Sequence, residues 1–239
     1  MKSERRHLAI IPARSGSKRF PGKNVALLGG LPLLAWTVKT ALSANLFHRV
    51  ILSVDHEEYA RVGIEYGAEC PWLRAAELAA DDTPSHAVVA DVLQRLAEQG
   101  EQYDRFTLLQ PTSPLRSVQD LHEAEKLMNT TEGDAVVSLV RCEHPPQWSN
   151  TLPGNGNLSG FINPKHRVPA NQLATHYRVN GAIFMAHTET YLSHLHFFTP
   201  KSRGYLMPRE RSVDIDEPFD LLVAETIIQQ KKYTLPWTT

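Results

Sequence analysis

The chain has 239 residues, of which 42% are hydrophobic and 21% are charged, as is typical of a folded globular protein. Its 25 Lys and Arg residues nearly balance 26 Asp and Glu residues, giving a net charge of −1 with histidine neutral. This balance excludes a uniformly basic surface for nucleic acid, and the length fits one α/β domain over residues 1–239 with a single insertion.

Predicted strands and helices alternate along most of the chain. Such alternation is typical of an α/β fold with a doubly wound, mostly parallel sheet flanked by helices. In chain order we expect a strand at 7–11, a helix at 32–45, a strand at 49–54, helices at 56–66 and 85–99, a strand at 106–109, a helix at 118–129, strands at 135–140, 181–186 and 205–207, and a helix at 217–231.

Residues 141–177 break this pattern. Five prolines punctuate polar sequence that also carries Gly and Asn. Loops of this length inside a compact domain are usually functional. We therefore predict that this segment is an insertion that leaves the core.

Nothing in the sequence predicts a membrane span or export. No apolar run approaches the roughly 18 residues that cross a bilayer, and Pro12 and Arg14 end the first run early. Cys70 and Cys142 are too few for a disulfide framework or a four-cysteine zinc site. We expect a cytoplasmic protein without membrane or nucleic-acid partners.

The loop after the first strand carries four cations and no acid. Arg14, Lys18, Arg19 and Lys23 lie among Gly and Ser residues whose backbone N–H groups can face a ligand. This composition, at the carboxyl end of a strand, favours a polyphosphate site over a solvated basic turn. It is not a Walker A loop, because Lys18 is followed by Arg rather than Ser or Thr.

Two further segments carry candidate site residues. Asp214 and Asp216 alternate, so an extended backbone places both on one side, where their oxygens suit Mg²⁺ or Mn²⁺. The alternative, Asp216 as a helix cap, leaves Asp214 unexplained. Residues 110–116 follow another strand and place polar groups at the ligand-binding end of the sheet, although Ser113 or Ser117 could also cap the next helix.

Other catalytic patterns are missing from the sequence. The eleven histidines have no recognised zinc spacing, and no Ser-His-Asp order or nucleophile elbow is visible. The sequence therefore gives no reason to expect a covalent enzyme intermediate.

Five segments, taken in order across nearly the whole chain, resemble the acylneuraminate cytidylyltransferase family, the CMP-sialic acid synthetases. The resemblance implies a nucleotidyltransferase-like fold and Mg²⁺-dependent transfer of CMP from CTP to the anomeric hydroxyl of a nine-carbon 2-keto sugar acid, N-acetylneuraminic acid or a relative, by direct in-line attack. The segments are 11–18 with Lys23 and Asn24, Arg74 with 77–79, 110–116, 180–182 and 214–216.

The resemblance also implies residue roles. Catalysis is assigned to Arg14, Lys23, Asp214 and Asp216, the last two also being the metal ligands. CTP binding is assigned to Arg14, Ser15, Gly16, Ser17, Lys18, Lys23, Asn24, Arg74 and Ser85, the last two flanking Asp82 and Thr83 in a cytidine-recognising segment. Binding of the sugar acid is assigned to Gln110, Thr112, Ser113, Arg167, Phe184, Phe197 and Phe198.

By the same resemblance, residues 141–177 form a dimerisation arm that reaches over the partner's cleft, and the protein is a homodimer. Phe197 and Phe198 are implied to face that interface, although paired aromatic residues more often lie in a core. The arm departs from the family at Ala170 and Gln147, where sialic-acid members carry Arg and Lys. Residues 165–167 could supply replacement cations, and a legionaminic-type acid remains an alternative substrate.

Two functions of other classes remain open. A doubly wound glycosyltransferase would also use two alternating aspartates for a metal, but would not need the basic loop. A non-catalytic nucleotide-binding regulator would have no need to keep Lys23, Asp214 and Asp216.

Overall fold

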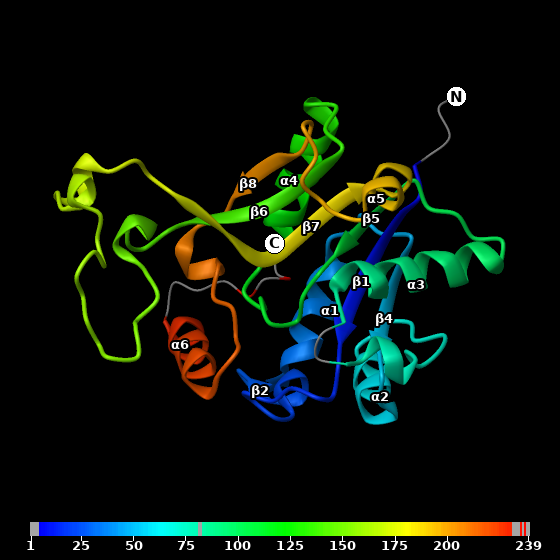
Figure 1. Ribbon diagram of the computed structural model, residues 1–239. Coiled ribbons are helices and arrows are strands. Elements are labelled where there is room, and N and C mark those ends of the chain that lie inside the picture. Colours follow the sequence, from blue (N-terminus) through cyan, green and yellow to red (C-terminus); the bar gives the residue numbers. More distant parts are fainter. Residues whose placement is uncertain (1–4, 81–82, 231–234, 236, 238–239) are drawn as a thin grey trace.

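The computed structural model describes residues 5–80, 83–230, 235 and 237, and is built around a six-stranded sheet (Figure 1). The strand order is β4-β1-β5-β7-β6-β8. β7 runs antiparallel to both of its neighbours, and all other pairs are parallel, which confirms the mostly parallel sheet. The strands are β1 (His7–Ala13), β4 (Arg49–Val54), β5 (Arg105–Leu108), β6 (Ala135–Arg141), β7 (Tyr177–His187) and β8 (Arg203–Leu206).

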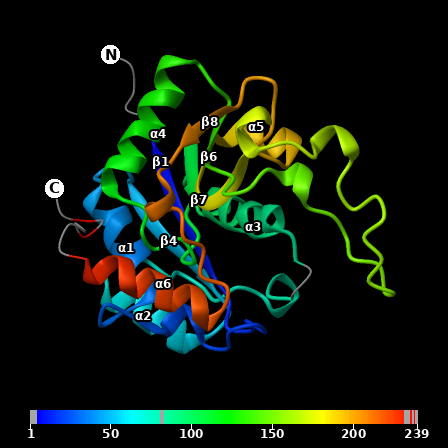
Figure 2. The same ribbon diagram turned by 90° about the vertical axis from the view of Figure 1, so that its left-hand side faces the viewer.

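Helices cover both faces of this sheet (Figures 1 and 2). They are α1 (Leu33–Ser43), α2 (Glu57–Glu65), α3 (Ser85–Glu98), α4 (Val118–Thr130), α5 (Thr188–His194) and α6 (Pro218–Gln229). Because side chains alternate along a strand, Ala9 and Ile11 pack with α1, α2 and α4, whereas Leu8 and Ile10 pack with α3 and α5. No helix in the described part of the chain is both long and apolar enough to span a membrane.

The predicted elements of the first 140 residues are all present, with bounds shifted by a few residues. β1 continues through Ala13 because both faces of the strand are buried, and α1 begins directly after Pro32. The sequence did not predict α5 or the hairpin of β2 (Leu27–Leu28) and β3 (Leu31–Pro32). α6 ends at Gln229, and Lys231, where we expected its end, lies outside the described residues.

The start of α4 settles one of the alternatives. Ser117 caps the helix: its hydroxyl accepts a hydrogen bond from the Asp120 N–H, and the Asp120 carboxylate accepts one from the Ser117 N–H. The fully buried Asp120 also accepts two hydrogen bonds from Arg211, at 2.8 and 2.9 Å. Since Arg211 precedes Asp214 by three residues, this ion pair fixes the chain that leads to the predicted metal ligands.

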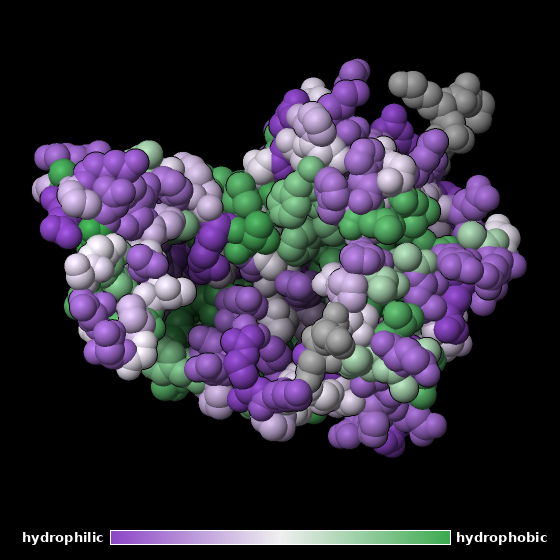
Figure 3. All heavy atoms as spheres, viewed as in Figure 1, coloured by the Kyte–Doolittle hydropathy of each residue, from purple (hydrophilic) through white to green (hydrophobic). Residues whose placement is uncertain are grey.

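The arm, residues 141–177, projects from the body and has a largely hydrophilic surface (Figures 2 and 3). Between β6 and β7 it contains three 3₁₀ turns, Pro146–Trp148, Pro164–His166 and Ala170–Gln172. The Trp148 Nε1–H donates to the His166 carbonyl at 2.9 Å and joins two of these turns. The segment is held largely by contacts within itself, and its role as an inserted dimerisation arm remains a prediction.

Candidate active site

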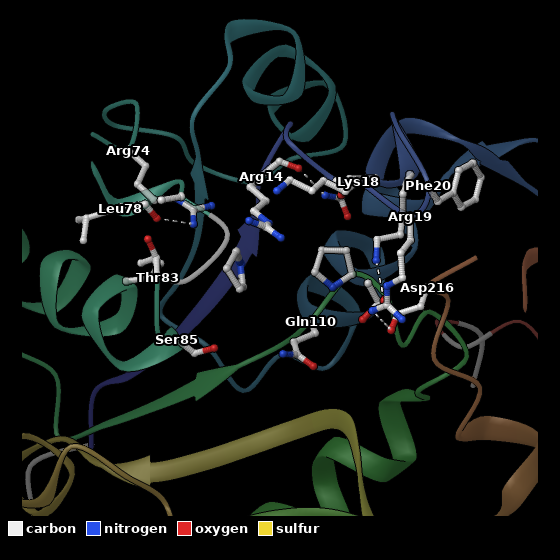
Figure 4. A pocket seen from close by; sticks show the side chains of 18 of the residues that line it. Arg14, Lys18, Arg19, Phe20, Arg74, Leu78, Thr83, Ser85, Gln110 and Asp216 are labelled. Atoms are coloured by element: carbon white, nitrogen blue, oxygen red, sulfur yellow. Dashed lines mark hydrogen bonds and ion pairs between the residues drawn. The ribbon is translucent and has the colours of Figure 1, made fainter. Parts of the chain in front are cut away.

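A cavity of about 330 Å³ lies at the carboxyl ends of β1 and β5 (Figure 4), and we call it the sheet-end cavity. Ligands of open α/β sheets bind at this end. Ten of the residues predicted from the sequence line it: Arg14, Ser17, Lys18, Lys23, Asn24, Arg74, Ser85, Gln110, Thr112 and Asp216.

The basic loop, residues 14–24, forms one side of the cavity, with Arg14 and Lys18 close together (Figure 4). The Asn24 side-chain amide donates to the Arg14 carbonyl at 3.0 Å and closes the loop on itself. Ser15 and Gly16 are not among the lining residues, and Ser15 binds Asp55 instead. The predicted contacts of Ser15 and Gly16 with CTP remain predictions.

Asp216 is bound by cations of the basic loop. Lys23 Nζ lies 2.9 Å from Oδ1, and Arg19 Nη2 lies 2.6 Å from Oδ2. Burial alone would raise the pKa of Asp216, but these two cations outweigh burial and lower it. Asp216 is not the cap of α6, because Glu217 and Asp220 form the capping box there.

Asp214 lies beside Thr112, half-buried and outside the cavity lining, and its buried Oδ1 has no hydrogen-bond partner among the described residues. Burial raises the pKa of Asp214, a hydrogen bond with Thr112 opposes this rise, and the charge of Asp216 adds to it. The Ile215 N–H donates to the Thr112 carbonyl at 2.7 Å, which fixes the backbone between the two aspartates.

This pair of carboxylates fits a magnesium ion. Both supply the hard oxygens that Mg²⁺ prefers, and the orphaned Oδ1 of Asp214 gains a partner when a cation is bound. The described residues contain no group of three or more His, Cys, Asp or Glu side chains that could hold a metal. A magnesium ion bound here would therefore take its remaining ligands from water and substrate phosphates, and the metal site remains a prediction.

Arg74 lies at the other end of the cavity from Asp216, near Leu78 and Thr83 (Figure 4). The backbone N–H of Arg74 donates to the Val54 carbonyl at 2.6 Å, and its side-chain Nη2 donates to the Ser53 carbonyl at 2.7 Å. Burial lowers the pKa of Arg74, and the nearby Asp55 carboxylate opposes that effect. Asp82, which the sequence placed in this segment, lies outside the described residues.

Gln110 faces the middle of the cavity (Figure 4) and passes close to Gly181 on β7. Gly181 has φ = +77°, and a Cβ there would lie 2.6 Å from Gln110 Oε1. Glycine therefore serves both the left-handed backbone and the close approach of Gln110. Ser113, in contrast, is fully buried and donates to the Asn180 carbonyl at 3.1 Å, so the structure gives it a supporting position.

Sequence reasoning missed the importance of Arg116, which is fully buried. Its guanidinium donates to the carbonyls of Gln110 and Ala182 and to the Thr37 hydroxyl. Burial lowers its pKa to about 9, which leaves it protonated at neutral pH. Arg116 thus joins α1, the 110–116 segment and β7.

Some predicted sugar-acid residues lie away from the cavity of their own chain. Phe197 is only 7% exposed and stacks with Phe106, Phe184 and Tyr191 on one face of the sheet, whereas Phe198 is 61% exposed. Arg167 lies on the arm, where its Nε donates to the Ile162 carbonyl. Phe197 thus occupies a core position, and binding of the sugar acid by Phe184, Phe197, Phe198 and Arg167 remains a prediction.

Two charged residues near the site were missed by sequence reasoning. Arg178, on β7, lies close enough for its charge to oppose the rise in the pKa of Asp214 that burial causes. Asp55 holds the basic loop through Ser15. Asp55 directly follows the predicted strand 49–54, so the strand-end argument used for residues 110–116 would have found it.

The chain is similar in sequence to known cytidylyltransferases. The model of the family described as "Cytidylyltransferase" matches residues 8–235. An N-acylneuraminate cytidylyltransferase of Escherichia coli is 41% identical over 226 residues, covering 94% of this chain and 52% of that protein. A CMP-N,N'-diacetyllegionaminic acid synthase of Legionella pneumophila is 33% identical over 235 residues, covering 96% of this chain and 99% of that protein.

The fold also resembles that of a solved structure. A solved structure of CMP:2-keto-3-deoxy-manno-octonic acid synthetase complexed with CTP superposes with a TM-score of 0.70 at 15% identity, covering 95% of this chain and 99% of the other. The chain spans about half the length of the E. coli relative and nearly all of the Legionella relative. With the family model matched over most of its length, the chain belongs to the cytidylyltransferase family.

Proposed function

We propose that this protein transfers CMP from CTP to the anomeric hydroxyl of N-acetylneuraminic acid or a close relative and releases pyrophosphate. The relatives described above are named for cytidylyl transfer to an acylneuraminic acid and for synthesis of a CMP-legionaminic acid. The observation that carries the proposal is that one cavity combines the basic loop, the Asp216 carboxylate and Gln110.

The cations of the basic loop have the first role. Arg14, Lys18 and Lys23 line the cavity where a triphosphate would lie, and their charges neutralise the phosphate oxygens. When the sugar hydroxyl attacks the α-phosphorus in line, the bond to the β-phosphate breaks, the hydroxyl proton is lost to solvent, and negative charge moves onto the leaving pyrophosphate. Lys23, already held by Asp216, is oriented to stabilise that charge without rearranging.

Asp214 and Asp216 would hold Mg²⁺, or Mn²⁺, which accepts the same ligands. The bound metal would orient the triphosphate and lower the pKa of the attacking hydroxyl. In this arrangement Thr112 and the Ile215 backbone keep the two carboxylates in place. Lys23 and Arg19 limit the repulsion between them.

Gln110 and Thr112 would bind the sugar acid from the middle of the cavity, and Arg74 and Ser85 would bind the cytidine at its far end. A legionaminic-type acid is the second candidate substrate. It is favoured by the arm, where Gln147 bonds with His176 and Ala170 carries no charge, and by the full-length match to the Legionella relative.

The proposal includes a homodimer in which the arm, with Lys165 and Arg167, reaches the partner's cavity. The projection of the arm from the body and the exposure of Phe198 and Leu206 support this assembly. A cytoplasmic location is also part of the proposal, because Cys70 and Cys142 are both free.

The deciding experiment measures pyrophosphate release from CTP and Mg²⁺ with a panel of nine-carbon sugar acids, including N-acetylneuraminic, legionaminic and pseudaminic acids. We expect release with at least one of the first two acids and formation of its CMP conjugate by mass spectrometry. CTP binding without pyrophosphate release from any acid would instead indicate a regulator, and turnover of a nucleotide sugar would indicate a glycosyltransferase.

A further inference from the structure

Asp55 lies where two neighbouring strands of the sheet end. β1 and β4 are parallel and in register, with Ala13 opposite Val54. The residues that follow these two strands therefore leave the sheet at the same end, the carboxyl end of both strands. Ser15 and Asp55 are therefore neighbours although forty positions separate them in the sequence.

Both carboxylate oxygens of Asp55 are bound by this one residue of the basic loop. The Ser15 N–H donates to Oδ1 at 2.8 Å, and the Ser15 hydroxyl donates to Oδ2 at 2.9 Å. Hydrogen bonds to a charged acceptor are stronger than those between two neutral groups. Together with the bond from Asn24 to the Arg14 carbonyl, they hold the loop at Arg14 and Ser15.

The same end of β4 also holds Arg74. Arg74 donates to the carbonyls of Ser53 and Val54, the two residues before Asp55. The two sides of the sheet-end cavity, the basic loop and the Arg74 segment, are thus attached to three consecutive residues. A carboxylate at this point would repel a triphosphate, but its oxygens are turned to Ser15, which lies outside the cavity lining.

We propose that Asp55 is a positioning residue that holds the basic loop, before CTP arrives, in the shape that receives the triphosphate. Asp55 touches no reacting atom and acts through Ser15, so it sets the distance between Arg14 on the loop and Arg74 on the opposite side. This inference rests on the proposed use of CTP. Its consequence is that loss of Asp55 weakens CTP binding more than it slows the bound complex. Asp55 holds the part of the loop around Arg14, which neutralises the phosphates before and during the reaction, whereas Lys23 is held separately by Asp216.

The test compares Asp55→Ala, Asp55→Asn and Ser15→Ala with Asp104→Ala as the matched control. Asp104 also accepts a backbone N–H, from Arg6 at 2.7 Å, but at the opposite end of β1. We expect Asp55→Ala to raise the KM for CTP about tenfold or more, with kcat and the KM for the sugar acid within about threefold. We expect a smaller rise in the KM for CTP in the other two variants. Ser15→Ala keeps the backbone N–H bond to Asp55, and Asp55→Asn keeps one acceptor oxygen.

Calorimetric titration of each folded variant with CTP and Mg²⁺ separates this inference from the proposed reaction. If the wild type binds CTP without releasing pyrophosphate, the proposed reaction is refuted, but the Kd values for CTP still test the positioning role of Asp55. An unchanged KM and Kd for CTP in Asp55→Ala, or equal losses in Asp55→Ala and Asp104→Ala, would overturn the role of Asp55. If Asp55→Ala does not fold, Ser15→Ala and Asp55→Asn decide: both must weaken CTP binding selectively, and wild-type affinity in both refutes the proposal.

Discussion

The loops at the carboxyl end of the sheet are tied to one another by side chains, whereas the arm is tied mainly to itself. Asp216 reaches Lys23 across 193 positions, and Arg116 reaches Ala182 across 66. The hydrogen bond from Trp148 to His166, by comparison, spans 18 positions and stays within the arm. The side chains that line the cavity are therefore held within this chain, whereas the hydrogen bonds of the arm do little to fix its position relative to the body.

The largest expected effect comes from removing Lys23. Lys23→Ala takes a charge from the cavity and leaves Asp216 with Arg19 alone. Loss of one oriented charge typically lowers kcat by about 100- to 1,000-fold. Pyrophosphate release measures this effect, with the exposed Lys126→Ala as the control. Activity of Lys23→Ala within about threefold of wild type would contradict the role assigned to the basic loop.

Removing the charge of Asp120 tests how the cavity is anchored. Burial would raise the pKa of Asp120, but Arg211 and Ser117 outweigh burial and lower it below 3.8. The stabilisation is therefore complete above about pH 4 and is lost as the pH falls through the folded-state pKa. We expect Asp120→Asn to cost about 3 kcal/mol at pH 7.

Urea unfolding of wild type and Asp120→Asn from pH 7 down to pH 2 measures this effect. The difference in the free energy of unfolding between the two proteins is expected to shrink toward the acid end, because protonation removes the same charge from the wild type. A constant difference across this range would show that Asp120 does not supply the acid dependence.

A smaller effect is expected from Gly181→Ala. The added methyl group strains a residue with φ = +77° and displaces the Gln110 side chain. We expect kcat/KM for the sugar acid to fall about tenfold, with the KM for CTP nearly unchanged. Gly30→Ala is the control, because Gly30 has φ = +81° but open space around it. Equal losses in both variants would mean that backbone strain, and not Gln110, is responsible.

The smallest effect on stability is expected in the arm. Trp148→Ala removes the bond to the His166 carbonyl, and Trp148→Phe removes only the donor. Because these contacts stay within the arm, the free energy of unfolding of the body is expected to change by less than about 0.5 kcal/mol. Limited proteolysis within the arm is expected to be faster in Trp148→Ala. A large loss of global stability would show that the arm and the body unfold as one unit.

The sequence was informative where local pattern and structure agree. The apolar run before Pro12 predicted β1, and strand ends followed by polar residues predicted the basic loop and the 110–116 segment. The short helix α5 carries no such pattern. It has seven residues and no side-chain N-cap bond, and it is held in place by Tyr191 packing on Phe106. Tertiary contacts of this kind cannot be read from periodicity.

Side-chain contacts between residues far apart in the sequence could not be predicted either. The alternation of Asp214 and Asp216 predicted a shared metal site, but it did not predict their different partners: Asp214 lies half-buried beside Thr112, and Asp216 is bound by Lys23 and Arg19. The Phe197-Phe198 pair shows the same limit, since one ring enters the core and the next is exposed. Such differences arise from the sheet topology, which the spacing of residues does not contain.

The burial of Arg116 also bears on the order in which the protein folds. Its acceptors on α1 and β7 lie 79 and 66 positions away in opposite directions along the chain. Two long loops must therefore close before the guanidinium can leave water, and each closure costs entropy. We expect early helices and the β1–β4 pair to form without it. The hydrogen bonds that join the 110–116 segment to β7 would then form late, in the step that docks β7, so the sheet-end cavity would be complete only when the sheet is complete.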